Sequence, residues 1–367
     1  MLFDSRDLSF LKLAGRYKWL PYDMLGKFGF DDLVCEVKKL AHNDYICISK
    51  NKKYIYPSPQ GYSLLHNLGY AYDPGVKKPY TGSPTLRRRL EVDEIMLTCL
   101  RAGIDVCRDN IDSLQHQPVF FPAFAIHDAT KFMSTANFSG FGHWGNKAYM
   151  LQYVGSESVG MYMGKETEYF ERLASIFDKS LKTPSALILA GSSYEQVHKQ
   201  IHDAAPSKRH GVKSFNDFWD VYRKTDLPVH LLSCDELGAK QLALMCRPDY
   251  NAKIARASFG ADWVTHDNEI PEADGCYESD PVVIVADMNL RRLDRVCAAA
   301  KELGRTKVYA AAFIEQIPFL HKILPAGIPV TTLEIDTVIN TDFKNLSLYS
   351  LDKYSAATGL KGVVIHV

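Results

Sequence analysis

The chain has 367 residues, enough for two or three domains. It is 46% hydrophobic and 23% charged, which excludes a disordered or fibrous protein, and no apolar run approaches the ~18 residues of a membrane-spanning helix. Bases and acids balance at 43 each, but residues 1–90 hold 15 bases against 8 acids and the remainder holds 28 against 35. This asymmetry predicts that any contact with a polyanion is made by the N-terminal part.

The compartment can be predicted from the first residues and from the cysteines. The segment MLFDSRDLSF lacks the apolar stretch of a signal peptide, and the eight cysteines include no C-x-x-C pair. We therefore expect reduced thiols, a cytoplasmic location and no membrane partner.

The first 75 residues show the clearest organisation. Apolar spacing predicts helices, and two β-rich runs around Lys50-Asn51-Lys52 predict a hairpin. The expected elements are helices over 4–18, 21–25 and 31–42, the hairpin over 45–57 and a closing helix over 62–68. Three helices, a hairpin and a closing helix follow the plan of a winged helix-turn-helix, which we predict for residues 1–75.

The rest of the chain predicts a linker and an α/β body. Residues 76–89 are the expected linker, because the stretch from 71 is rich in Pro and Gly. The body divides into an α/β domain over 90–265 and a βαβαβ region over 280–367. Strands alternate with helices from residue 186 onward, which favours a mostly parallel sheet and an α/β class, α+β overall. We expect a long loop over 134–147, a second hairpin over 148–154 and 159–163, no regular pattern over 247–279, and no internal repeat.

Two stretches carry a resemblance to a known family. Residues 6–70, above all the hairpin Tyr45–Tyr56 and the following segment Pro57–Tyr70, resemble the N-terminal winged helix of replication-relaxation proteins. These proteins are encoded on plasmids and integrative elements of Gram-positive bacteria. The segment Leu86–Ala102 resembles the helix that follows their wing. The resemblance implies DNA binding, a role in replication, transfer or regulation of a plasmid or conjugative element, and a central region similar to restriction endonucleases.

The expected hairpin of the body lacks the residues of an active nuclease. Such a site needs an acid on one strand and a Glu/Asp-x-Lys on the next, so that carboxylates hold Mg²⁺ beside the scissile phosphate. Neither 148–154 nor 159–163 contains Asp or Glu. The body is therefore predicted to be non-catalytic, with a metal-dependent nuclease or relaxase-like enzyme as the alternative.

Other candidate motifs predict neither a metal nor a cofactor. His198 and His202 stand one helical turn apart but have no third ligand nearby in the sequence. His127-Asp128 lacks a third group to orient it, and the Gly-rich segment 139–146 does not match a P-loop. Gly191-Ser192-Ser193 could hold an anion at a helix start, although the same pattern is typical of an ordinary strand-to-helix turn.

Basic residues of the N-terminal part are the predicted DNA contacts. They lie at the hairpin tip, late on the third helix and after the linker: Lys50, Lys52, Lys53, Lys38, Lys39, Arg87, Arg88 and Arg89. Acids on the third helix, Asp31, Asp32 and Glu36, would repel phosphate. A protein-interaction scaffold is therefore a further alternative. Double-stranded DNA is the predicted partner, with proteins of the replication or transfer machinery and a second copy of the chain as additional expectations.

Overall fold

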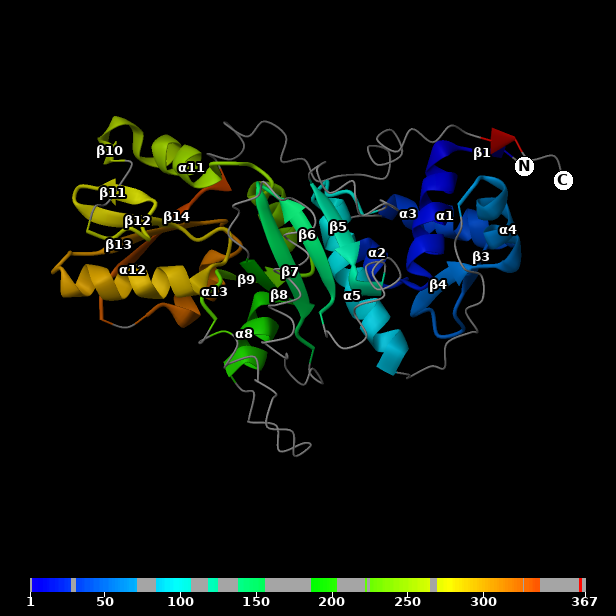
Figure 1. Cartoon of the computed structure of the whole chain (residues 1–367), viewed down its shortest axis with the longest axis horizontal. Helices are drawn as coiled ribbons and strands as arrows, with labels where there is room; N and C mark the ends of the chain where they lie inside the picture. Colours follow the sequence, from blue (N-terminus) through cyan, green and yellow to red (C-terminus); the bar gives the residue numbers. More distant parts are fainter. Residues whose placement is uncertain are drawn as a thin grey trace, which may run out of the picture. The chain divides into compact units, whose positions relative to one another are not determined.

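The structure is a computed structural model, and it forms two compact units (Figure 1). Unit 1 contains Met1–Asn110 and Leu348–Val367, and unit 2 contains Ile111–Ser347. The structure describes residues 2–27, 31–70, 84–106, 118–124, 138–155, 186–202, 222, 225–264, 269–325, 327–336 and 363–364.

Unit 1 packs helices on a small antiparallel sheet. Its helices are α1 (Ser5–Tyr17), α2 (Met24–Lys27), α3 (Asp31–His42), α4 (Pro59–Asn67) and α5 (Pro84–Arg101). Strands β2 (Leu20–Pro21), β3 (Ile46–Ile48) and β4 (Tyr54–Pro57) form a sheet of order β2-β4-β3, and β1 (Leu2–Phe3) pairs with β15 (Val363–Val364). Asp4 caps α1, and Ser58 caps α4 by accepting from Gly61 N–H.

The predicted element order of the N-terminal part is confirmed, with one local correction. The helix over 31–42 and the hairpin are present as expected. The second helix is present but starts at Met24 instead of Pro21, because Pro21 lies in β2, where Leu20 pairs with Ile55. Proline is tolerated at that place because β2 is an edge strand. The assignment of these elements as a winged helix-turn-helix stays a prediction.

Helix α5 starts earlier than expected and belongs to unit 1. The predicted linker ends at Arg89, whereas α5 begins at Pro84. The cause is apolar packing, since Leu86 and Leu90 lie against Trp19 and Tyr54. Arg87, Arg88 and Arg89 therefore stand on a helix of unit 1, not on a linker before the body.

Unit 2 contains two five-stranded sheets (Figure 1). The first runs β5 (Val119–Pro122), β6 (Gly140–Trp144), β7 (Lys147–Tyr153), β8 (Ala186–Gly191) and β9 (Val229–Ser233). The second runs β10 (Trp263–Val264), β11 (Gly275–Tyr277), β12 (Asp280–Ile284), β13 (Val308–Ala312) and β14 (Val330–Glu334). The described helices are α8 (Tyr194–His202), α10 (Glu236–Met245), α11 (Tyr250–Phe259), α12 (Leu290–Glu302) and α13 (Ile317–Ile323), with a 3₁₀ turn at Gly260–Asp262. This arrangement confirms the α/β class.

The two sheets repeat one topology. In each, the first three strands form an antiparallel meander, and the last two add in parallel. The unit thus contains a structural repeat, and both sheets are mixed. The loop predicted over 134–147 is wrong because β6 lies there, and β6 is the hairpin partner of β7. The other predicted partner, 159–163, lies outside the described residues.

Fully buried strands form the core of unit 2. Strands β8, β9, β12 and β13 are buried along their whole length, as expected for sheets that are covered on both faces. Helices α11 and α12 cover opposite faces of the second sheet (Figure 1): Tyr309 contacts Phe259 of α11, whereas Val308 and Ala310 belong to the core that includes α12.

Candidate nucleic-acid interface

A tight turn joins β3 to β4 and carries three lysines. Ser49 organises it: its hydroxyl accepts from Lys53 N–H at 3.0 Å and from Tyr54 N–H at 3.1 Å. Lys52 adopts a left-handed conformation with φ 53°, and its N–H donates to Ser49 O at 2.8 Å. The backbone of this turn is therefore fixed by hydrogen bonds to Ser49. We call residues 49–53 the wing turn, after the predicted winged helix.

The lysines of the wing turn project into solvent. Lys50, Lys52 and Lys53 are exposed, and none has an ion-pair partner among the residues that the structure describes. Three cations within four positions repel one another, so their side chains favour an anionic partner such as phosphate.

The start of α5 packs in one apolar cluster with the strand that follows the wing turn. Tyr54 directly follows Lys53, Leu86 directly precedes Arg87, and Tyr54 and Leu86 pack together with Trp19. Arg87 and Arg88 are exposed. Arg87 also lies 3.8 Å from Glu91, an exposed contact that salt screens readily. Two segments separated by more than thirty residues therefore join one apolar cluster, and we call their exposed cations the basic face: Lys50, Lys52, Lys53, Arg87 and Arg88.

The remaining predicted cations differ in availability. Lys38 is exposed on α3. Arg89 is half-buried and interacts electrostatically with the buried Asp93. Lys39 binds the carboxylate of Asp7 at 2.6 Å; this contact outweighs burial and raises the pKa of Lys39. Lys39 and Arg89 thus face internal carboxylates, while Lys38 remains open to a ligand. Nothing is described of the side chains of Asp31 and Asp32.

The hairpin of unit 2 that pairs β6 with β7 contains no carboxylate side chain. Strand β6 reads Gly-Phe-Gly-His-Trp and β7 reads Lys-Ala-Tyr-Met-Leu-Gln-Tyr. Trp144 is fully buried and stacks on Tyr149, with ring centroids 4.6 Å apart. Its ring lies over Gly142, where an added Cβ would stand 2.0 Å from it. The Gly-rich segment is therefore a strand packed by aromatics, not a phosphate-binding loop.

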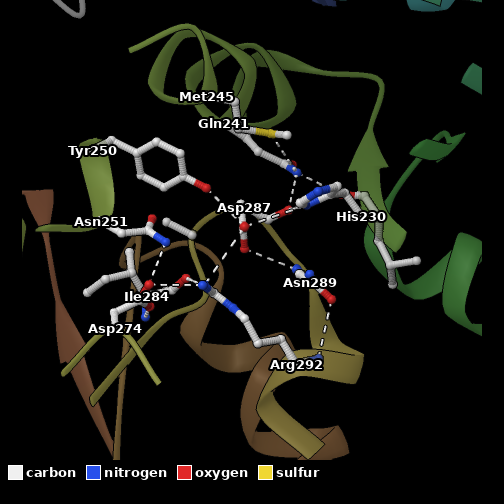
Figure 2. A network of polar contacts seen from close by, with 12 residues as sticks. His230, Gln241, Met245, Tyr250, Asn251, Asp274, Ile284, Asp287, Asn289 and Arg292 are labelled. Carbon is white, nitrogen blue, oxygen red and sulfur yellow. Dashed lines mark hydrogen bonds and ion pairs between the residues drawn. The ribbon is translucent and has the colours of Figure 1, made fainter. Parts of the chain in front are cut away.

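Sequence reasoning missed a buried polar network in unit 2 (Figure 2). Asp274 precedes β11 and Asp287 follows β12. Because these two strands pair antiparallel, both acids lie at the open end of the hairpin. Arg292 lies between them, 2.9 Å from Asp274 Oδ1 and 3.9 Å from Asp287 Oδ2. Tyr250 donates to Asp287 Oδ2 at 2.9 Å. No local motif marks this cluster, because its members come from separate segments of the chain.

The acids of this network accept hydrogen bonds from backbone N–H groups of the protein. Asp274 Oδ2 accepts from Ile284 N–H at 2.6 Å, and Asp287 Oδ1 accepts from Asn289 N–H at 3.1 Å. Burial alone would raise the pKa of Asp287, but the charge of Arg292 and the hydrogen bonds from Asn289 N–H and Tyr250 outweigh it and lower that pKa. Asp287 is therefore an ionised carboxylate whose counter-charge is Arg292.

Two further side chains tie this network to the first sheet. His230 Nδ1 lies 2.9 Å from the backbone oxygen of Asp287, and burial lowers the His230 pKa, so the ring is neutral and donates. Gln241 donates to the same oxygen at 2.9 Å and to Leu231 O at 2.8 Å (Figure 2). The arrangement joins the two sheets through hydrogen bonds from β9 and α10 to the residue that follows β12.

The other sequence candidates do not assemble a site. The rings of His198 and His202 are tilted by 36° with centroids 4.1 Å apart, and the described residues contain no group of three or more metal-ligating side chains. The amide of Ser192 donates to Gln196 Oε1, so the turn after β8 bonds its own helix. His127-Asp128 lies outside the described residues. No described helix has the length and apolar character to cross a bilayer.

Comparison with protein families, with curated proteins and with solved structures finds no match to this chain.

Proposed function

We propose that the protein binds double-stranded DNA through the basic face of unit 1 and does not cleave it. The observation that carries the proposal is that Leu86 and Tyr54 belong to one apolar cluster, which joins the start of α5, with Arg87 and Arg88, to the strand that follows the wing-turn lysines. Five exposed cations on one small unit can neutralise phosphates of a DNA backbone. The resemblance to replication-relaxation proteins adds the proposal that the DNA belongs to a plasmid or conjugative element.

The geometry favours contacts to the phosphate backbone over reading of base edges by α3. A recognition helix reads bases through its N-terminal part. On α3, Glu36 carries a carboxyl group and the ammonium group of Lys39 is bound to Asp7, so neither side chain offers a free cation to DNA. The exposed cations instead lie on the wing turn and on α5. We therefore propose that binding is mainly sequence-independent, with Lys38 as the contact available on α3.

The test is titration of the full-length chain into a labelled random-sequence duplex, followed by gel analysis of the DNA. We expect saturable binding that weakens as salt rises, with the duplex intact in Mg²⁺ or Mn²⁺. The variant R87A/R88A should bind several-fold more weakly, whereas K199A/K253A, which removes two exposed lysines of unit 2, should bind normally. Absence of binding, or equal loss in both variants, would contradict the proposal.

Two observations define the alternatives. The acidic residues of α3 favour a protein-binding role for unit 1, which would show as no affinity for DNA at low salt. A nuclease would need acids outside the described hairpin β6–β7. Nicking of supercoiled plasmid that is lost on substitution of one carboxylate would establish that alternative.

A further inference from the structure

A cluster of three acids and one base joins α1 to α3. Asp4 and Asp7 come from the start of α1, and Glu36 and Lys39 come from α3. The side chain of Asp7 is fully buried, and that of Glu36 is 13% exposed. Lys39 Nζ lies 2.6 Å from Asp7, 3.7 Å from Asp4 and 3.8 Å from Glu36. One cation therefore faces three carboxyl groups.

Two carboxylate oxygens in this cluster lack a donor. Asp7 Oδ2 accepts from Lys39 and from Asp4 N–H at 3.2 Å. Asp7 Oδ1 and Glu36 Oε2 are both buried, and neither has a hydrogen-bond partner among the described residues. The two side chains lie within hydrogen-bond reach of each other. Because ionised carboxylates only accept, a single proton is the simplest group that satisfies both oxygens.

We infer that Glu36 carries a proton shared with Asp7 in the mildly acidic range and releases it near neutral pH, so that the α1–α3 contact is a pH-sensitive switch. Burial, followed by the hydrogen bond and the charge of Asp7, raises the pKa of Glu36 to about 7; Lys39 opposes this shift and Asp4 reinforces it. Helix α2 and strand β3 also pack on α3, and their described side chains add no charged group to the cluster.

The sign of the pH effect follows from the raised pKa of Glu36. The folded protein holds this proton more tightly than the unfolded chain, whose Glu36 titrates near 4.5. The stabilisation is complete below that value and is lost as pH rises through about 7. On the proposed function, release also adds a negative charge to α3 and weakens DNA binding above neutral pH.

The direct test is a carboxyl ¹³C NMR titration of the full chain labelled at glutamate, from pH 4 to 9. We expect one resonance to titrate near pH 7 and to disappear in E36Q, while E302Q, at an exposed position on α12, retains it. A Glu36 resonance that titrates below pH 5 would overturn the inference. This readout does not depend on DNA, so a chain that fails to bind DNA but retains this titration would refute only the proposed function.

A second measurement covers the case in which the resonance is not resolved. Thermal unfolding of the wild type between pH 5 and pH 8 should show a falling Tm, and E36Q should show a smaller fall, because glutamine donates a hydrogen bond to Asp7 at every pH. E302Q should follow the wild type. The same pH dependence in E36Q and in the wild type would contradict the inference.

Discussion

At the scale of single residues, Asp287 is the charge on which the polar network of unit 2 depends. The side chain of Arg292 is only 16% exposed and has Asp274 and Asp287 as counter-charges. We predict that D287N lowers the free energy of unfolding by about 3–5 kcal/mol, because it leaves a buried cation undercompensated. Urea denaturation at pH 7 measures this. E272Q, which breaks an exposed pair with Arg295, should cost under about 1 kcal/mol.

The pH dependence of D287N gives the same prediction a second test. The pKa of Asp287 is lowered, so its contribution is present above the unfolded value near 4 and is lost as pH falls through the lower folded value. The stability gap between wild type and D287N should therefore shrink below about pH 4. A gap that stays constant down to pH 3 would show that the loss at pH 7 is not electrostatic.

Gly142 is required by an aromatic ring on its own strand. A Cβ at this position would lie 2.0 Å from the Trp144 ring, which is fully buried. We predict that G142A costs about 1–3 kcal/mol by overpacking. In a W144V background the ring is absent, so the added methyl should cost much less. A double-mutant cycle measures this coupling, and strictly additive costs would show that the clash is relieved elsewhere.

At the scale of elements, local patterns predicted unit 1 well. The helix Asp31–His42 and the hairpin β3–β4 follow from apolar spacing and from a polar turn between β-rich runs. The sequence does not distinguish the two places that suit Pro21, since a proline is accepted in the first turn of a helix and in an edge strand such as β2. The packing of Leu86 with Tyr54 and Trp19 could not be predicted, because it joins segments that are far apart in the sequence.

The strands of unit 2 were harder to predict because tertiary packing overrides local composition. Gly140–Trp144 has the composition of a loop, yet Trp144 covers the glycines and stabilises β6. The repeated topology of the two sheets leaves no trace in the residues: β8 reads Ala-Leu-Ile-Leu-Ala-Gly and β13 reads Val-Tyr-Ala-Ala-Ala. Short buried strands need only small or branched apolar residues. The order in which they pair therefore cannot be predicted from a sequence motif.

At the scale of the whole molecule, the division into units predicts where the chain can be cut. Helix α5 covers Trp19 and Tyr54, and Tyr17 donates to Val106 O at 2.8 Å. We predict that a fragment of residues 1–110 has a clearly higher Tm than a fragment of residues 1–85, which uncovers these aromatics. Thermal unfolding followed by circular dichroism compares them. Equal Tm values would place α5 outside the folding unit.

The central claim concerns the basic face, and the salt dependence of DNA binding tests it most directly. The measurement is the slope of log K against log salt for the full-length chain on a random duplex. Replacement of Lys50, Lys52 and Lys53 by alanine should flatten the slope by about two to three units, since each phosphate contact contributes about −0.9. The control K199A/K253A/K301A removes three exposed lysines of unit 2 and should keep the wild-type slope. An unchanged slope in a folded wing variant, or equal flattening in the control, would contradict the account.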